Sequence, residues 1–145
     1  MAGYMRKLNG YVYDGEHEAA AALANGVFAE INANGKVVAI TAAGDMELRV
    51  DEKTTLWGKD ALVLNVIVPG TKEQYFVEND IGDIHEECNY DGAEYACRVG
   101  DYVRMHRPVI NDQLIMTVDA TTYAALNVGD TVKPAVGGGV AKKSA

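Results

Sequence analysis

Turn-forming dipeptides recur along this chain and leave room only for short elements between them. Each dipeptide joins Asn or Asp to Gly, the residues that most readily adopt the positive φ angles of tight turns. Stretches rich in Val, Ile, Tyr and Thr, which are typical of β-strands, fill most of the intervals. The sequence therefore predicts a mainly β protein. The five dipeptides are Asn9-Gly10, Asp14-Gly15, Asn25-Gly26, Asn34-Gly35 and Asp91-Gly92.

Hydrophobic patterning identifies individual strands. Residues 26–41 predict a β-hairpin with its turn at 32–35, and residues 46–50 alternate apolar and charged side chains, as a strand with one buried side does. The apolar run at 61–68 indicates a central strand that is buried on both sides. We expect a single small β-sandwich or barrel of about eight short strands. The remaining strands are expected within 74–78, 95–99, 101–106 and 114–118.

Two segments have helical character instead. Residues 16–25 contain good helix formers, with Asp14 placed to cap them and Gly26 placed to end them, so we expect one short N-terminal helix there. Its apolar face consists almost entirely of alanine, which buries little area, and an extended arm is the alternative. Residues 121–126 predict a single helical turn before the last strand.

A short motif occurs twice, as Val-Gly-Asp-Tyr-Val at 99–103 and Val-Gly-Asp-Thr-Val at 128–132. In each copy the glycine permits a sharp turn, and the aspartate can accept a hydrogen bond from the backbone of that turn. The surrounding residues do not match, so we interpret the motif as a repeated way of entering a strand.

The two ends of the chain are expected to be flexible. We divide the chain into an N-terminal arm (1–15), a β domain (16–134) and a Gly-rich tail (135–145). A phosphate-binding loop needs a helix after its glycines, and only six residues follow Gly139. Small and charged residues at a chain end bury too little area to become ordered by themselves.

Composition limits the classes of partner. The formal net charge is −8, and an acidic surface repels phosphate backbones, so we expect no nucleic-acid partner. No apolar run is long enough to act as a signal sequence or to span a bilayer, which predicts a cytoplasmic protein without a membrane partner. Cys88 and Cys97 fit a reducing compartment as free thiols, and a disulfide between them is the alternative.

Metal and catalytic sites find little support in the pattern. Four His and Cys side chains are of the right type to bind zinc. Structural zinc sites use paired, closely spaced ligands, and these four residues do not have that spacing. The acidic segment 78–87 lacks the order of acids and the central glycine of an EF-hand. The only serine is Ser144, in the expected tail, and no carboxylate pair has apolar flanks. We expect no metal, no cofactor and no enzyme activity. The zinc candidates are His85, Cys88, Cys97 and His106.

Tyrosine is the abundant aromatic residue, with eight copies against one Trp and two Phe. Tyr4, Tyr11 and Tyr13 cluster in the N-terminal arm. A tyrosine side chain offers both apolar area and a hydroxyl group, which suits docking onto another protein. We therefore assign partner binding to these three residues. In the alternative, Tyr11 and Tyr13 simply begin the first strand.

Residues 25–41 (NGVFAEINANGKVVAIT) and 108–138 (PVINDQLIMTVDATTYAALNVGDTVKPAVGG) carry a family resemblance. The chain resembles the decoration, or head-stabilising, proteins of tailed bacteriophage capsids. The resemblance implies a structural virion protein, assembled in the host cytoplasm, that binds the outside of the major capsid protein lattice, often as a homo-trimer. The alternative is a soluble ligand- or carbohydrate-binding β module that uses the acidic segment 78–94 and nearby tyrosines.

Overall fold

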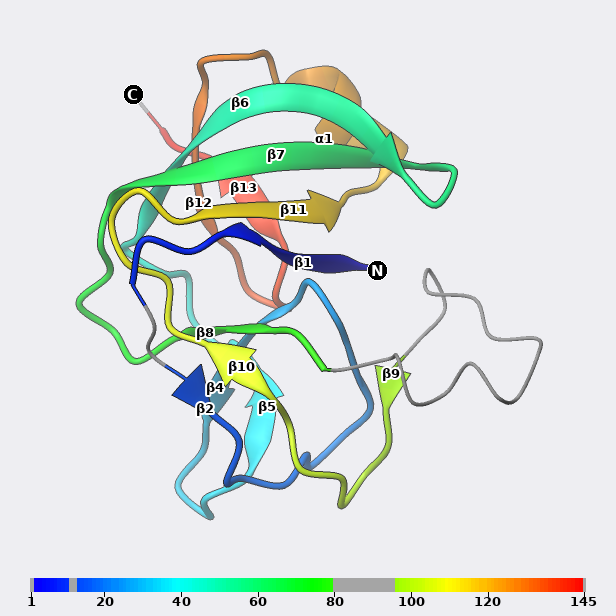
Figure 1. Ribbon diagram of the computed structural model, residues 1–145, viewed down its shortest axis with the longest axis vertical. Helices are drawn as coiled ribbons and strands as arrows, with labels where there is room; N and C mark the ends of the chain where they lie inside the picture. Colours follow the sequence, from blue (N-terminus) through cyan, green and yellow to red (C-terminus); the bar gives the residue numbers. More distant parts are fainter. Residues whose placement is uncertain (1, 11–12, 80–95, 145) are drawn as a thin grey trace.

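A computed structural model describes residues 2–10, 13–79 and 96–144 of the chain. Within this part of the chain, thirteen β-strands form three antiparallel sheets, and one short helix lies near the C-terminus (Figure 1). The mainly β prediction is therefore confirmed, although the sheets do not close into a barrel. No helix among these residues has the length and apolar character needed to cross a membrane.

The first sheet has six strands and contains the first and the last strand of the described chain. Strand β7 lies at its centre, between β11 and β6, as the apolar run at 61–68 predicted. Strands β6 and β7 form a long hairpin that turns at Trp57 and Gly58. In sheet order, the strands are β1 (Gly3–Lys7), β11 (Gln113–Thr117), β7 (Lys59–Val68), β6 (Glu47–Leu56), β12 (Thr131–Pro134) and β13 (Val140–Lys142).

The second sheet has five shorter strands and lies below the first sheet in Figure 1. The hairpin predicted at 26–41 is confirmed, and Gly35 N donates to Asn32 O at 3.0 Å in its turn. In sheet order, the strands are β2 (Tyr13–Asp14), β10 (Met105–His106), β8 (Tyr75–Val77), β4 (Phe28–Ile31) and β5 (Val37–Ala39). A third sheet pairs β3 (Leu23–Ala24) with β9 (Ala96–Cys97).

The main core lies between the two larger sheets. Phe28 and Phe76 of the second sheet meet edge to face, with ring centroids 5.4 Å apart, and both are fully buried. They belong to one cluster with Leu62 and Leu64 of β7 and Leu114 of β11. The other face of the second sheet packs in a separate cluster that includes Leu23 and Cys97. The alternation at 46–50 is confirmed, because Met46, Leu48 and Val50 are buried.

The helix expected at 16–25 is wrong, and this segment is extended. Glu18 and Ala19 form isolated bridges with Tyr102 and Val37, and β3 follows. Val37 N donates to Glu18 O at 2.9 Å, and Ala20 N donates to Val37 O at 3.0 Å. As a helix, the alanine-rich face would bury little area, whereas the extended chain satisfies the backbone groups at the edge of β5.

The helical turn expected near the C-terminus is confirmed as α1 (Ala120–Ala125). Asp119 caps it, and its side chain accepts a hydrogen bond from Thr122 N at 2.7 Å. This carboxylate satisfies one of the N–H groups that the first turn of a helix leaves without a partner.

Both copies of the Val-Gly-Asp motif form the predicted turn. Asp101 accepts from Arg98 N, and Asp130 accepts from Asn127 N, each at 2.9 Å. These backbone hydrogen bonds lower the pKa of both carboxyl groups below the ordinary value. A lowered pKa means that each turn is stabilised while its aspartate is ionised, and this contribution disappears as the pH falls through that pKa.

The prediction of flexible terminal segments is wrong, because both segments contain paired β-strands. Residues 135–145 were expected to form a tail, but β13 lies within them and pairs with β12. Residues 135–139 form the turn between these strands, in which Gly138 N donates to Ala135 O at 2.9 Å, and Phe28 N donates to Gly138 O at 2.8 Å. In the N-terminal arm, β1 pairs with β11. Neither segment could order itself alone, but both satisfy their backbone groups on strands that are distant in the sequence.

The two positive-φ glycines of the β12–β13 turn give a test of this packing. A Cβ atom on Gly138 (φ 97°) would lie 2.2 Å from Val27 Cγ1 and 2.9 Å from Phe28 O, whereas one on Gly137 (φ 94°) meets nothing within 4 Å. We expect Gly138→Ala to lower the free energy of unfolding by about 2–4 kcal/mol, from overpacking and backbone strain together. The matched variant Gly137→Ala adds backbone strain alone, about 1–2 kcal/mol. Urea denaturation measures both, and equal losses would contradict the packing of Gly138 on β4.

Candidate functional site

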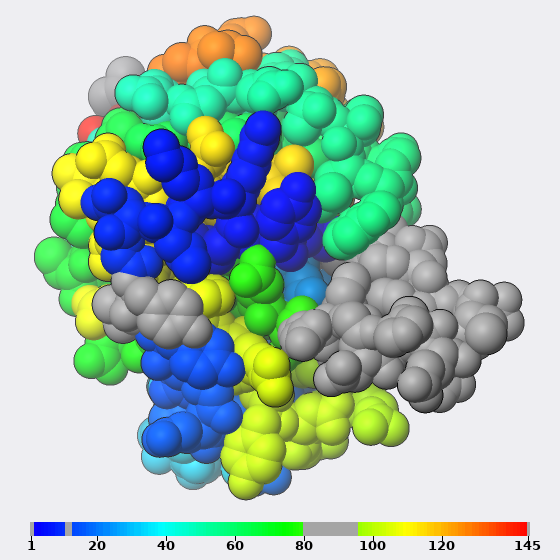
Figure 2. All heavy atoms as spheres, in the orientation of Figure 1, coloured from blue at the N-terminus to red at the C-terminus, as the bar shows by residue number. Residues whose placement is uncertain are grey.

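A groove of about 590 Å³ opens where the N-terminal strand, the tip of the β6–β7 hairpin and the second sheet meet. Figure 2 shows the face of the molecule on which the blue N-terminal segment crosses beside the blue-green β6–β7 hairpin. We call this hollow the aromatic groove. It is lined by Gly3, Tyr4, Leu8, Tyr13, Asn25, Trp57, Glu78, Asn79, Arg104 and His106.

The groove brings together two of the three predicted partner-binding residues. Tyr4 and Tyr13 both line it, joined by Leu8 and Trp57, and all four side chains are between 38 and 47% exposed. Tyr11 lies outside the described residues. The clustering of tyrosines near the N-terminus therefore identified part of the groove, and the fold adds a tryptophan from a hairpin more than forty residues away in the sequence.

Trp57 occupies an unfavourable backbone conformation. It has φ of 49° and precedes Gly58 with φ of 77°, so both central residues of this hairpin turn have positive φ. Asn, Asp and Gly adopt such angles readily, whereas a bulky side chain costs about 1–2 kcal/mol. The turn nevertheless presents the indole at 47% exposure on the rim of the groove. Strain of this kind, held at an exposed aromatic residue, points to a role in function.

The sequence prediction missed Trp57 because Trp-Gly is not among the usual dipeptides of tight turns. The signal that could have found it is the pattern around residues 57–58, where two strand-like runs meet without any other turn residue.

Glu78 joins the two large sheets at the floor of the groove. Its Oε2 accepts from Met5 N of β1 at 2.5 Å, and its Oε1 lies 3.3 Å from His106 Nε2 of β10. The His106 ring in turn meets Tyr13 edge to face at 5.6 Å. This chain of contacts fixes the edge strand β1, and with it Tyr4, against the second sheet.

The structure separates the former zinc candidates that it describes. Cys97 is buried in the second core cluster, and burial raises the pKa of its thiol, which disfavours the reactive thiolate form. His106 lies in the groove instead. Among the residues that the structure covers, no group of three or more His, Cys, Asp or Glu side chains could hold a metal ion. His85 and Cys88 fall outside those residues, as does most of the acidic segment 78–94.

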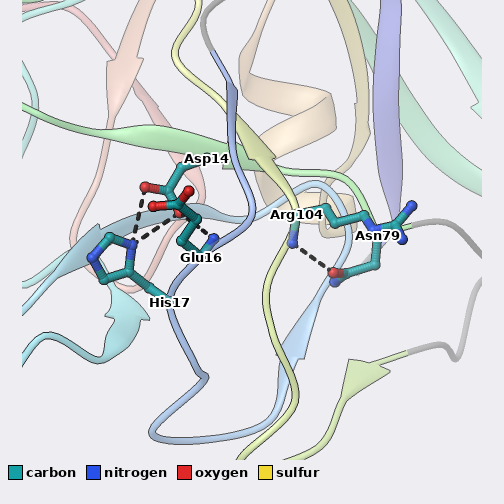
Figure 3. A network of polar contacts seen from close by, with 5 residues as sticks. All are labelled: Asp14, Glu16, His17, Asn79 and Arg104. Carbon is teal, nitrogen blue, oxygen red and sulfur yellow. Dashed lines mark hydrogen bonds and ion pairs between the residues drawn. The ribbon is translucent and has the colours of Figure 1, made fainter.

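Two asparagines bind each other at the back of the groove. Asn25 Oδ1 accepts from Asn79 N at 2.7 Å, and Asn25 Nδ2 donates to Asn79 O at 3.1 Å. Asn79 Oδ1 accepts from Arg104 N at 2.9 Å (Figure 3). This last bond fixes the orientation of the Asn79 amide, because a flipped amide would place its NH₂ group against a donor. Asn79 Nδ2 is buried and has no hydrogen-bond partner among the residues that the structure describes.

A second hollow of about 530 Å³ adjoins the aromatic groove and shares Tyr13 and Arg104 with it. We call it the acidic hollow, because Asp14 and Glu16 lie on its wall. Asp14 is held by His17, whose Nδ1 lies 3.0 Å from both carboxylate oxygens (Figure 3). Gly15 and Tyr102 complete its lining.

The residue types around the groove are those that dominate binding energies at protein interfaces, where Trp, Tyr and Arg are enriched. No family model, curated protein or solved structure matches the chain. Function is therefore inferred from the groove and from the resemblance in the sequence. In chemical terms, the described residues of the groove offer aromatic faces for apolar contacts, a carboxylate acceptor in Glu78 and an amide donor in Asn79 that none of them uses.

Proposed function

We propose that this chain is a structural virion protein, not an enzyme, that binds the outside of a phage capsid lattice and stabilises it as a decoration protein. The observation that carries the proposal is the grouping of Tyr4, Tyr13 and Trp57 around one groove, with Trp57 held there against its backbone preference. The resemblance at 25–41 and 108–138 supports the choice of partner, the major capsid protein.

The proposed mechanism is stabilisation by mass action. A protein that binds the assembled lattice but not its dissociated subunits lowers the free energy of the assembled state in proportion to RT ln(1 + [L]/Kd). A DNA-filled shell is under outward pressure, so a clip across subunit boundaries opposes its opening. We propose that the chain acts as a homo-trimer at three-fold positions, with no nucleic-acid or membrane partner. The packing of two sheets around one core supports a sandwich as the finer description of the fold.

The test is reconstitution on expanded capsids that lack the protein. We expect the purified chain to co-sediment with these capsids, to saturate at a fixed number of copies per shell, and to raise the melting temperature of the shell. Light scattering of the free protein measures its oligomeric state. Absence of co-sedimentation and of any shift in capsid melting would refute the proposal.

The aromatic groove also favours one alternative, a soluble module that binds a carbohydrate or another small ligand. Exposed aromatic rings beside a carboxylate and an amide suit the apolar face and the hydroxyl groups of a sugar ring. Screening the isolated protein against a glycan array tests this. Saturable glycan binding without capsid binding would favour the alternative.

A further inference from the structure

We propose that the aromatic groove and the acidic hollow form one channel that receives an extended polypeptide segment of the capsid subunit. In this arrangement, a large apolar side chain of the segment lies among Tyr4, Leu8 and Trp57, and a basic side chain a few residues away faces Glu16. That the segment belongs to the capsid subunit rests on the proposed function. That it is extended and carries an apolar and a basic side chain is inferred from the two hollows.

The size and continuity of the two hollows favour an extended chain. They share Tyr13 and Arg104, so an occupant can pass from one to the other. Their volumes, about 590 and about 530 Å³, together exceed the upper end of about 1,000 Å³ for small-molecule sites. An extended segment advances about 3.3 Å per residue, so a few residues can occupy both hollows at once.

The amide of Asn79 supplies the hydrogen bond that a peptide backbone needs. Only 7% of this residue is exposed, yet its Nδ2 has no acceptor within the described part of the chain, and an unsatisfied buried donor costs about 1–3 kcal/mol. A peptide carbonyl would satisfy it. Asn25 shows the same recognition inside the molecule, because its amide binds both the N–H and the C=O of Asn79.

Glu78 complements this donor with an acceptor. Each carboxylate has about four lone-pair sites, so Glu78 can accept an N–H from the segment while it keeps its contacts with Met5 and His106. The donor of Asn79 and the acceptor of Glu78 belong to neighbouring residues at the end of β8. Together they offer an extended backbone the same two kinds of bond that a strand edge offers.

The charges of the acidic hollow favour a basic side chain. Asp14 is already held by His17, whereas Glu16 is exposed and makes no ion pair with any other described residue. Tyr13 and Tyr102 line the same hollow, and the face of a tyrosine ring can attract a cation. Arg104 stands at the boundary of the two hollows, so the basic side chain is expected on the far side of it, next to Glu16.

Trp57 provides a built-in probe, because it is the only tryptophan in the chain. Overlapping synthetic peptides covering the major capsid protein encoded with this chain would be titrated into the full-length protein. We expect one peptide, or a few adjacent ones, to shift the emission of Trp57 to shorter wavelength in a saturable way. Replacing the basic residue of that peptide with alanine, or Glu16 with glutamine, is expected to raise Kd about tenfold.

Asn79→Asp tests the amide donor, because it keeps the Oδ1 acceptor for Arg104 N and removes the N–H. We expect at least a tenfold rise in Kd for the peptide, with folding checked by circular dichroism. Val136→Ala is the control, since Val136 is exposed and lines neither hollow. Should Asn79→Asp fail to fold, the peptide titration of the unmodified protein, followed by the emission of Trp57, still tests whether the channel binds a peptide.

The outcomes separate this inference from the proposed function. If the protein binds capsids but no capsid peptide changes the emission of Trp57, the channel is not a peptide site and the inference is overturned while the function stands. If a glycan rather than a peptide causes the shift, the inference is likewise overturned. If the protein binds neither capsids nor any capsid peptide, the proposed function fails as well.

Discussion

Replacing Phe76 with alanine is expected to lower the free energy of unfolding by about 3–5 kcal/mol. Phe76 is fully buried in β8 and meets Phe28 between the two large sheets. Truncation of its ring leaves a cavity at the centre of the main core, and it also removes the edge-to-face contact. Because a domain of this size is stable by only about 5–15 kcal/mol, the variant would lose a large part of its stability.

Urea denaturation followed by circular dichroism measures this loss. Phe76→Leu keeps part of the buried volume and should lose less. Val128→Ala is the surface control, because Val128 is 62% exposed and the change should stay within about 0.5 kcal/mol. A loss below about 1 kcal/mol in Phe76→Ala would show that the two sheets do not depend on a shared core.

The elements that the sequence predicted correctly are those specified by local residues. The β4–β5 hairpin follows from Asn34-Gly35 and its flanking strand residues, and α1 follows from helix formers placed after Asp119. The turns at Asp101 and Asp130 likewise depend only on residues within the motif. In each case, the decisive hydrogen bonds join residues that are close together in the sequence.

The elements that the sequence missed depend on distant partners. Strand β1 is ordered by β11, with Thr117 N donating to Ala2 O across 115 residues of sequence. Strand β13 is ordered by β12, and Gly138 in the turn before it accepts from Phe28 N of β4. Residues 16–25 have helix-forming composition, but the free edge of β5 offers their backbone a better set of partners. Local propensity gives no sign of either effect.

The candidate site shows the same division. Tyr4 and Tyr13 could be identified from their clustering near the N-terminus, which needs no knowledge of the fold. Trp57 and Asn79 could not, because only the pairing of strands brings the tip of the β6–β7 hairpin and the end of β8 to the same groove. The amide donor of Asn79 could not be predicted either, because its lack of a partner among the described residues depends on the bond between Asn79 Oδ1 and Arg104 N of a distant segment.

Replacing Trp57 with asparagine is expected to weaken binding to capsids and to raise the free energy of unfolding. Asparagine adopts the positive φ of this turn readily, and Asn-Gly is a favoured pair for such hairpins, so the free energy of unfolding should rise by about 1 kcal/mol. The same substitution removes the largest aromatic side chain from the rim of the groove. Truncating a tryptophan at the centre of an interface costs about 2 kcal/mol or more, which corresponds to roughly 30-fold weaker binding to capsids.

Ile110→Ala is the matched control for this substitution. Ile110 has the same 47% exposure as Trp57 but lies outside the groove, so its truncation removes exposed apolar area without touching the proposed contact surface. Capsid co-sedimentation and urea denaturation would be measured on both variants. Unchanged capsid binding in Trp57→Asn would remove the groove from the interface. A lower free energy of unfolding in Trp57→Asn would contradict the functional reading of the strain. It would show that contacts of the indole within the protein itself outweigh the backbone strain at residue 57.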